Sequence, residues 1–399
     1  MIKPTISIII SINFSVRYIL RSGIIDKLLD KFFVNIFLTW NDPQLVSDFE
    51  SRGCNVIILP KSHFSKSFIR SNDLLNLWHN KKIIKTGNDR WYEQRCFDDS
   101  YNFHIKVLRT LRDLYHHLIL INLPFYIKKM RTLKTFDKKN TNIKIFQKII
   151  KKYNSDLVLT LTPFHPDEVL LLKAFEKKHT PIIASILSFD NISKRGIMPF
   201  NFSKIFVWNQ KNKESMLKSN ADLNESDVEI IGPVQFDFYY DKKYTLKRSD
   251  WYANKLVKNK KVILYNGGVP IYFKYEPAYL EYIDSAIKNG QIDNAVIILR
   301  IHPLDNINRW RDVVDKSKNI IISEVWGQNN KSILEKKYQN ITDEDIKILK
   351  ADLMYSDVHI SICSTMVIDG SIFDKPQIGP AFDSRGYLSS KKINNIYRQ

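Results

Sequence analysis

Short apolar runs alternate with segments of helical periodicity through the first sixty residues of the chain. The first run, residues 5–12, reads TISIIISI, and a nearly continuous apolar run is typical of a strand buried on both faces of a parallel sheet. Helical periodicity follows over 16–30, and the pattern repeats as an apolar run at 33–40, a helix at 43–52 and a third run at 55–59. This βαβαβ alternation predicts a doubly wound α/β sheet.

The same alternation returns at residue 156, after a long stretch without strand signals. Residues 61–153 have a mainly helical pattern, so we interpret them as a helical insertion in the first domain. Beyond this insertion, the predicted strands cover 156–161, 181–187, 204–208 and 228–231, and the predicted helices cover 169–178 and 210–219. The first domain is therefore expected to contain one parallel sheet interrupted by a helical segment.

A break in the pattern at Gly232-Pro233 separates this domain from a second one. Residues up to about 260 are charged and lack strong periodicity, and a new α/β series then begins. Its predicted strands cover 261–265, 295–300, 319–323, 358–362 and 377–382, with a helix over 277–288 and further helices on either side of the fourth strand. We predict two Rossmann-like domains, residues 1–240 and 241–399, whose parallel sheets face a central cleft that holds the site.

The formal net charge of +19 narrows the choice of partners less than its size suggests. Much of it comes from Lys scattered among Ile and Asn, so charge alone is weak evidence for nucleic acid. The sequence also lacks an RNA-binding sheet signature and a zinc-like cluster. A negatively charged donor, a polyanionic acceptor or a membrane surface fits the charge equally well, and we expect no nucleic-acid partner.

Cysteine usage and hydropathy indicate the cellular compartment in which the protein is expected. Cys54, Cys96 and Cys363 are isolated in the sequence, which argues against a disulfide framework and in favour of a reducing compartment. No apolar run reaches the roughly 18 residues that a membrane span needs. The predicted location is cytoplasmic, and the basic insertion adds peripheral attachment to the inner face of the cytoplasmic membrane as a hypothesis.

The helical insertion is strongly basic. Between His104 and Lys152 there are thirteen Lys or Arg against two Asp, and aromatic residues are interleaved nearby. Charge runs of this kind are usually a solvated surface. The functional interpretation is a platform for an anionic acceptor or for the membrane face, and the sequence leaves both interpretations open.

Three polar turns follow predicted strands of the second domain. Because the carboxyl ends of parallel strands meet at one edge of a sheet, we expect these turns to converge. Their residues are Asn266, Gly267 and Gly268 in the first turn, Arg300, His302 and Pro303 after the next strand, and Ser364, Thr365 and Met366 at the start of a helix that carries Asp369. A glycine turn, a cation beside an imidazole, and a helix start all suit a phosphate group, so we predict a nucleotide-donor site.

The general base is expected in the first domain, on loops that follow strands. The candidates are Asp190 in one loop and His165, Asp167 and Glu168 in another. Asp190 is favoured because its loop is polar and ends in Gly196, although Asp190 could equally form an Asx turn. The second domain shows no acidic pair with metal-ligand spacing, so we predict neither a metal nor a bound cofactor.

These residues together resemble GT-B glycosyltransferases. The second half of the chain is similar to the GT-B donor domain and, more narrowly, to the CDP-glycerol glycerophosphotransferase group and the bacterial polysialyltransferases. The similarity lies in Arg300-Ile301-His302-Pro303, Asp352-Leu353, Ser356-Asp357, Ser364-Thr365, Asp369 and Lys375-Pro376, in Ile231-Gly232-Pro233 with Asp237, and in Ser188-Phe189-Asp190-Asn191 through Arg195-Gly196 with Val207-Trp208. It covers nearly the whole chain except the basic insertion.

The resemblance implies roles for individual residues, and the chain also departs from it. By that resemblance, His302 would contact the donor phosphate, which Ser364 and Thr365 would also bind. Asp369 would lie near the ribose or the transferred group. The second His-containing motif of the glycerophosphotransferases is not evident, and Asp167-Glu168 is only a loose substitute for the acidic signature of the polysialyltransferases. The crossing helix that usually ends GT-B proteins is not evident either, as expected of a C-terminally truncated chain.

The activity that the resemblance implies is that of a metal-independent GT-B glycosyltransferase or a glycerophosphotransferase-like enzyme. Such an enzyme would use a nucleotide-sugar or CDP-alcohol donor and a glycan or lipid-linked acceptor to build a cell-surface polysaccharide or glycolipid. Two other classes stay open. One is an enzyme like the UDP-sugar 2-epimerases, which share this architecture, and the other is a non-catalytic polysaccharide-assembly protein.

Overall fold

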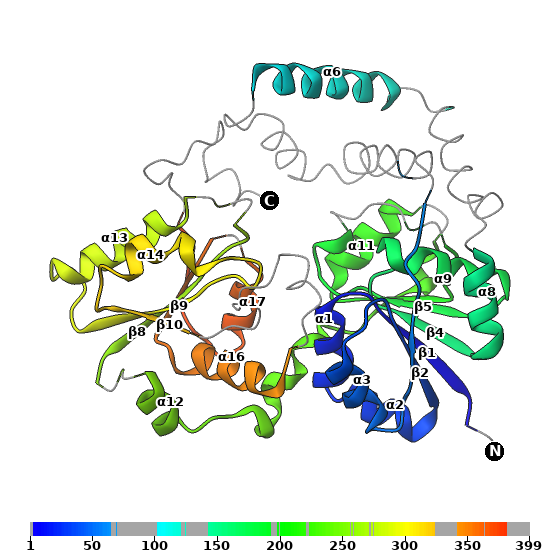
Figure 1. Cartoon of the computed structure of the whole chain (residues 1–399), viewed down its shortest axis with the longest axis horizontal. Helices are drawn as coiled ribbons and strands as arrows, with labels where there is room; N and C mark the ends of the chain where they lie inside the picture. Colours follow the sequence, from blue (N-terminus) through cyan, green and yellow to red (C-terminus); the bar gives the residue numbers. More distant parts are fainter. Residues whose placement is uncertain are drawn as a thin grey trace. The chain divides into compact units, whose positions relative to one another are not determined.

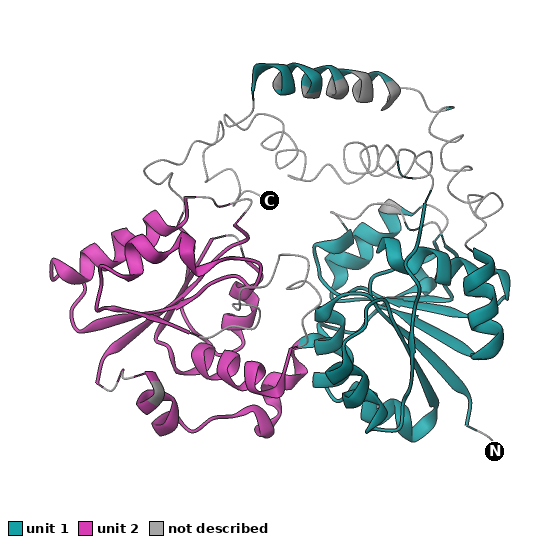
Figure 2. Ribbon diagram, viewed as in Figure 1, with its two compact units in different colours: residues 1–235 teal, residues 236–399 magenta. Residues whose placement is uncertain are grey.

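The chain divides into two compact units. Its computed structural model describes residues 3–64, 69, 102–120, 124, 143–192, 198, 200–220, 223–255, 257, 259–270, 273, 275–323, 341–362 and 364–380 (Figure 1). The units are residues 1–235 and 236–399 (Figure 2). This division falls close to the predicted boundary at residue 240.

The first unit is built on a seven-stranded parallel sheet with the order β3-β2-β1-β4-β5-β6-β7. The strands are β1 (Thr5–Ile10), β2 (Phe33–Leu38), β3 (Asn55–Ile58), β4 (Leu157–Thr160), β5 (Ile182–Ser185), β6 (Lys204–Val207) and β7 (Val228–Ile230). Each lies within a predicted apolar run. The order 3-2-1-4-5-6, which begins at the edge strand β3, is that of a doubly wound sheet, so this prediction is confirmed.

Helices cover both faces of this sheet (Figure 1). They include α1 (Asn13–Val16), α2 (Ile24–Lys31), α3 (Pro43–Glu50), α8 (Ile143–Lys152), α9 (Pro166–Lys177) and α11 (Gln210–Ser219). Ile8 and Ile36 share a buried cluster with residues of α2 and α3, whereas Ile9 and Phe37 share one with residues of α8 and α9. Because successive strand residues enter different cores, the strands are continuous apolar runs.

One predicted helix is divided in the structure. The periodicity predicted a single helix over 16–30, whereas α1 continues into a π-helical segment, Arg17–Arg21, and α2 begins only at Ile24. Between them Gly23 has a φ of 77°, a left-handed conformation that glycine adopts without a clash of a side chain. The prediction of one continuous helix was therefore wrong at this turn, because a short break hardly disturbs the apolar periodicity.

The basic insertion is described in part. It contains α6 (Phe103–Leu120) and α8, in agreement with the helical prediction for those residues. Helix α8 packs in the core of the first unit through Ile143, Phe146 and Ile150. Most of the rest of the predicted insertion, including Lys128, Lys129 and Arg131, lies outside the described residues.

The second unit has a five-stranded parallel sheet with the order β10-β9-β8-β11-β12. The strands are β8 (Lys261–Asn266), β9 (Ala295–Arg300), β10 (Ile320–Ile322), β11 (Val358–Ser361) and β12 (Gln377–Ile378). Helices α13 (Pro277–Lys288) and α14 (Arg311–Val314) lie on one face and α16 (Asp343–Tyr355) on the other (Figure 1). Helix α17 (Met366–Ser371) follows β11.

Residues 234–255, which belong to the stretch with weak periodicity, are held on the second unit by isolated side-chain contacts. They form the short helical turns η5 (Val234–Tyr240) and η6 (Lys242–Tyr244) and the helix α12 (Arg248–Lys255). Trp251 is buried and its Nε1–H donates to Asp352 at 2.8 Å, while Lys350 donates to the carbonyl of Asp241 at 2.9 Å. Isolated anchors of this kind leave no apolar stripe for a periodicity analysis to find.

The predicted fold class is confirmed, since the chain is an α/β protein with two parallel sheets of Rossmann-like order. The central cleft between the sheets stays a prediction. Among the described residues, no helix is long and apolar enough to cross a membrane.

Candidate functional site

Each sheet changes its direction of winding beside its first strand. In the second unit, β8 lies between β9 and β11, so the chain proceeds first to one side of β8 and later to the other. Ligands of doubly wound proteins bind beyond the carboxyl ends of the strands at such a switch point. Here that edge includes Asn266, which is in register with both Arg300 and Ser361. The corresponding point of the first unit lies between β1 and β4.

Asn266 ends β8, and its side chain is buried without hydrogen bonds. Only 3% of the residue is exposed, and neither its Nδ2 nor its Oδ1 has a partner within the part of the chain that the structure describes. Leaving a buried polar group unsatisfied costs about 1–3 kcal/mol, so such groups are rare in native proteins. The amide could donate to one atom of a ligand and accept from another.

Gly267 brings the first two predicted turns into contact. Its N–H donates to the carbonyl of Arg300 at 2.8 Å. A Cβ at this position would lie 3.2 Å from the ring of Trp310 and 3.3 Å from the backbone nitrogen of His302. The convergence expected for the turns after β8 and β9 is therefore present, and a residue without a side chain permits it.

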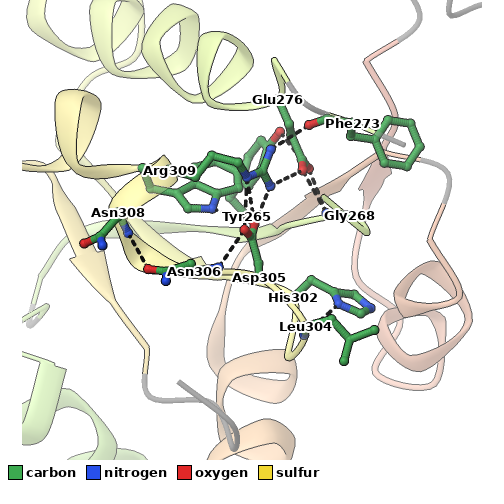
Figure 3. Close-up of polar contacts among 11 residues, drawn as sticks. Tyr265, Gly268, Phe273, Glu276, His302, Leu304, Asp305, Asn306, Asn308 and Arg309 are labelled. Atoms are coloured by element: carbon green, nitrogen blue, oxygen red, sulfur yellow. Dashed lines mark hydrogen bonds and ion pairs between the residues drawn. The ribbon is translucent and has the colours of Figure 1, made fainter. Parts of the chain in front are cut away.

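A buried carboxyl holds this turn from another side. Both oxygens of Glu276 accept from the N–H of Gly268, at 2.9 and 3.0 Å, and Nη2 of Arg309 lies 3.3 Å from Oε2 of Glu276 (Figure 3). Arg309 also pairs with Asp305 and donates from Nη1 to the carbonyl of Phe273 at 2.6 Å. One guanidinium thereby links the turn after β8 to the loop after β9.

Burial changes the protonation of Glu276. The side chain is fully buried, and desolvation raises its pKa to about 7. The N–H of Gly268 and the charge of Arg309 oppose this rise, whereas the nearby Asp305 adds to it. Glu276 therefore changes its charge near neutral pH while it holds the turn.

His302 presents a neutral imidazole. Its Nδ1 accepts from the N–H of Leu304 at 3.1 Å, which assigns the ring proton to Nε2 in the neutral form. Burial lowers the pKa of His302 to about 4, and Asp305 opposes that change. The imidazole points away from Glu276 (Figure 3), and Pro303 follows His302 in the sequence. His302 thus offers a neutral N–H donor, and its contact with a phosphate, like that of Pro303, stays a prediction.

Arg300 belongs to an internal ion pair. Its Nη1 lies 2.7 Å from Oδ2 of Asp352 and donates to Ser323 at 3.1 Å. Arg300 and Asp352 are both buried. The sequence suggested that Arg300 and His302 act together on a phosphate, but the guanidinium is engaged between β9 and α16 and gives that pairing no geometric support.

The third predicted turn begins α17. Ser364 Oγ accepts from the N–H of Met366 at 3.2 Å, and Thr365 is the N-cap residue. The Ser364 hydroxyl therefore satisfies one N–H at the start of the helix, and contacts of these three residues with a phosphate stay predictions. Asp369 is buried and accepts from the hydroxyl of Tyr239 at 2.5 Å, so it also anchors η5, and its predicted place near a ribose stays a prediction.

The candidate bases of the first unit lie in two environments. Because β4 and β5 are neighbours, the loops that carry them emerge at one edge of the sheet. His165 caps α9, with its Nδ1 accepting from the N–H of Asp167 at 3.3 Å. Asp190 Oδ1 accepts from the side-chain hydroxyl of Ser188 at 2.7 Å. These three residues are partly exposed, whereas Glu168 is fully buried, and catalytic roles for all four stay predictions.

Glu168 lies at the switch point of the first unit, surrounded by hydroxyl groups. Its Oε1 accepts from Ser11 at 2.5 Å and from Thr162, and its Oε2 accepts from Thr160. Ser11 Oγ and Thr162 Oγ1 lie 2.6 Å apart. Burial raises the pKa of Glu168 to about 7, the hydroxyls oppose that rise, and Asp167 adds to it. Glu168 thereby connects the ends of β1 and β4 to α9.

The residues that hold the turn after β8 were not predicted from the sequence. Glu276 precedes Pro277, the first residue of α13, and an acidic residue there has the pattern of an ordinary helix start. Asp305 and Arg309 are four residues apart, a spacing that is common for solvent-exposed ion pairs. The spacing could have suggested the pair, but only the tertiary structure reveals that Glu276 and Asp305 are buried.

Metal coordination was not predicted for this site. Across the described ranges, no group of three or more His, Cys, Asp or Glu side chains is arranged to hold a metal ion. Metal independence stays a prediction, since residues beyond those ranges and the substrate itself can also supply ligands.

Comparisons with known proteins identify the fold. No protein-family model and no curated protein matches the sequence. A putative UDP-N-acetylglucosamine 2-epimerase from Listeria monocytogenes has a similar structure over 100% of this chain and 87% of its own, with a TM-score of 0.56 and 9% identity. The UDP-GlcNAc 2-epimerase from Neisseria meningitidis bound to UDP-GlcNAc is similar over 99% and 89%, with a TM-score of 0.53 and 9% identity.

A glycosyltransferase shares the same architecture. The enzyme from Rickettsia africae ESF-5 is similar over 95% of this chain and 79% of its own, with a TM-score of 0.50 and 14% identity. At these identities the comparisons show the fold alone. This chain has the two-domain GT-B-like fold that these structures share.

Proposed function

We propose that the chain is a glycosyltransferase, or a related glycerophosphotransferase-like enzyme, that takes a nucleotide-activated donor at the strand ends of its second unit. The shared fold with a glycosyltransferase and with nucleotide-sugar epimerases supports a nucleotide-sugar substrate. The acceptor would be a glycan or a lipid-linked sugar, and the product a cell-surface polysaccharide or glycolipid. The reaction is proposed to need neither a metal nor a bound cofactor, and to take place in the cytoplasm.

The buried amide of Asn266 is the observation that carries this proposal. It lies at the switch point of its sheet, and both of its polar atoms lack partners among the described residues. Beside it, His302 offers a neutral Nε2–H donor. A nucleotide donor has both acceptor oxygens on its phosphates and donor hydroxyls on its sugars, so it could satisfy both halves of the amide.

Replacement of Asn266 by Ala tests the proposal. Titration calorimetry with CMP, CDP, UDP and GDP should identify a nucleotide whose affinity falls by about 1–3 kcal/mol in the variant. The stability of the free protein should be unchanged or higher, since the variant no longer buries an unsatisfied amide. Asn289→Ala, an exposed change at the C-cap of α13, is the matched control.

The nucleotide-site proposal fails under either of two results. One is that no nucleotide binds the wild-type protein, and the other is that affinity is the same in wild type and Asn266→Ala. Lower affinity accompanied by a large loss of stability would assign Asn266 a structural role instead.

An epimerase is the second candidate, because two of the structures compared above are UDP-GlcNAc 2-epimerases of similar fold. The two activities differ in what they require. An epimerase converts a UDP-sugar without an acceptor, whereas a transferase releases nucleotide only when an acceptor is present. Chromatography of the reaction products with and without a glycan acceptor separates these two. A binding protein for polysaccharide assembly would show neither product.

Helix α6 supports a membrane-bound acceptor for the transferase. Phe103, Val107, Leu111, Leu114 and Leu118 are all exposed, and their spacing puts them on one face of the helix. Lys106, Arg109 and Arg112 are interleaved with them in the sequence. An exposed apolar face with neighbouring basic residues is typical of a helix that lies in the surface of an anionic bilayer.

Vesicle sedimentation tests this attachment. Binding to phosphatidylglycerol vesicles should exceed binding to phosphatidylcholine vesicles and should weaken as salt rises, because each Lys or Arg contributes about 1 kcal/mol by a screened interaction. Leu111→Asp combined with Leu114→Asp should abolish binding, while Lys218→Glu, an exposed charge change on α11, should leave it nearly unchanged. Binding that ignores lipid charge, or survives the double substitution, would refute attachment through α6.

A further inference from the structure

The hydrogen bonds around Glu168 outnumber the protons that the hydroxyl groups can supply. Four oxygen–oxygen contacts join Glu168 to its neighbours and the neighbours to each other: Ser11 to Glu168 Oε1, Thr162 to Oε1, Thr160 to Oε2, and Ser11 to Thr162. Each hydrogen bond needs one proton. The three hydroxyls carry three protons, so an ionised carboxylate would leave one contact between two oxygens without a proton.

A proton on the carboxyl completes the count. Glu168 Oε1–H donates to Ser11, Ser11 donates to Thr162, and Thr162 donates back to Oε1, which closes a ring of three hydrogen bonds. Thr160 donates to Oε2 outside the ring. All four residues are buried, so no water competes for these protons. The ring can also run in the opposite direction with the same total of protons.

We propose that Glu168 is a positioning residue that carries its proton in the folded protein, closing a hydrogen-bond ring that joins the ends of β1 and β4 to α9. The surroundings agree with a neutral acid. From β1 and β4 its hydrogen-bonding neighbours are the uncharged side chains Ser11, Thr160 and Thr162, and from α9 the charged neighbour is Asp167, whose negative charge disfavours an ionised Glu168. The described contacts of Glu168 include no cation.

This assignment has a consequence for the reaction, which rests on the function proposed above. An acid that holds its proton in a closed ring is a poor base for an acceptor hydroxyl. The general base is then one of the partly exposed candidates, Asp190, Asp167 or His165. Glu168 acts instead through the loops that it holds, since Asp167 immediately precedes it in the chain and His165 lies three residues before it.

Infrared difference spectroscopy tests the proton directly. At about pH 6, wild type minus Glu168→Gln should contain the C=O band of a protonated carboxyl, and the band should fade as the pH is raised through 7. Glu176→Gln is the matched control, because Glu176 lies on the same helix and is paired with Lys173, so its removal should take away an ionised-carboxylate band. An ionised-carboxylate band for Glu168 at about pH 6 would overturn the proposal.

A second variant tests the ring rather than the proton. Thr162→Val keeps the shape of the side chain and removes one hydroxyl of the ring. In this variant Glu168 is unchanged, and its C=O band should move toward the frequency of a less strongly hydrogen-bonded acid. An unmoved band would show that no ring exists, and this measurement stays available if Glu168→Gln fails to fold.

The pH profile of transfer separates this inference from the proposed function. If Glu168 only positions its loops, Glu168→Gln should keep the acidic limb of the profile, since Gln imitates the neutral acid. Loss of that limb would make Glu168 the base and refute the positioning role. If the protein transfers nothing, the infrared result still decides the protonation of Glu168, so the two proposals fail separately.

Discussion

Each unit buries a carboxyl beside the first strand of its sheet, and the two have different partners. Among the described contacts, Glu168 in the first unit pairs with hydroxyl groups, whereas Glu276 in the second pairs with a backbone N–H and the guanidinium of Arg309, with the hydroxyl of Tyr265 farther away at 3.4 Å. Burial raises the pKa of both to about 7. The comparison shows that two fully buried acids with different partners reach a similar pKa, because desolvation is the largest cause of the shift in both.

The two switch points also differ in what they leave unsatisfied. Around Glu168 every hydroxyl is used, and the cluster is complete without a ligand. Beside Glu276 the turn begins at Asn266, whose amide has no partner in the described ranges. A complete network stabilises a fold, whereas a buried polar group that lacks its partner indicates a place where a ligand is expected.

The largest expected effect comes from removing the cation of the second unit. Arg309→Met leaves the buried carboxyls of Glu276 and Asp305 without their shared partner. Breaking a buried ion pair on one side typically costs about 3–5 kcal/mol, and denaturant unfolding at neutral pH should show a loss of that size. Arg311→Met, at a far more exposed arginine two residues on, is the control and should change stability by less than about 0.5 kcal/mol.

This measurement tests whether the buried carboxyls at the two switch points differ in their need for a charged partner. A loss below about 1 kcal/mol for Arg309→Met would mean that Glu276 and Asp305 become neutral without cost, as we propose for Glu168. The different partners of Glu168 and Glu276 would then make little difference to the free energy of unfolding.

The next effect is a difference in pH dependence. An acid whose pKa is raised by folding stabilises the protein fully below its unfolded value of about 4.5, and that stabilisation is lost as the pH rises through about 7. The shift of about 2.5 pKa units corresponds to about 3.4 kcal/mol for each group, at 1.36 kcal/mol per pKa unit. Glu168→Gln and Glu276→Gln should each remove one such contribution to the slope of the unfolding free energy against pH.

The stabilities of the two variants, each compared with wild type, should then diverge at high pH. Near pH 8 Glu168→Gln should be at least as stable as wild type, because it avoids burying a charge among hydroxyls. Glu276→Gln should be less stable than wild type there, because it loses the attraction to Arg309. Thermal unfolding from about pH 4.5 to 8 measures both, and parallel curves for the two variants would contradict the comparison.

Two histidines contribute to the pH dependence of stability with the opposite sign. Burial lowers the pKa of His302 and His359 to about 4, so each stabilises the fold above about 6.5 and loses that contribution as the pH falls through 4. Both residues are present in wild type and in the Gln variants. Their effect therefore cancels when the variants are compared with wild type, although it flattens the curve of wild type alone.

The smallest effect tests the hydroxyl outside the ring. Thr160→Val removes the donor to Oε2 of Glu168 and keeps the volume of the side chain nearly constant. The loss should be about 1 kcal/mol, the net value of one buried hydrogen bond. Denaturant midpoints of wild type and variant give the difference, and a loss above about 3 kcal/mol would show that Glu168 depends on Thr160 as on a charged partner.

Prediction from sequence succeeded where the signal was local. The continuous apolar run around Ile8 and the glycine turn at Gly267 were recognised, because apolar patterning and glycine both act on the adjacent chain. The break at Gly23 and the single anchor Trp251 were missed, because neither disturbs a periodic pattern. Of the predicted donor residues, Asn266 has a buried side chain without hydrogen-bond partners among the described residues, whereas Arg300 is engaged by Asp352.

The sequence by itself determined that the chain forms two parallel α/β sheets and that polar turns follow their strands. It did so because burial on both faces of a sheet requires apolar runs that can be read along the chain. Only the tertiary structure decided how the polar residues are used, since Arg309 meets Glu276 and Ser11 meets Glu168 across long stretches of chain. Burial and hydrogen-bond partners, which set charge and ligand capacity, are properties of those distant contacts and leave no periodic trace in the sequence.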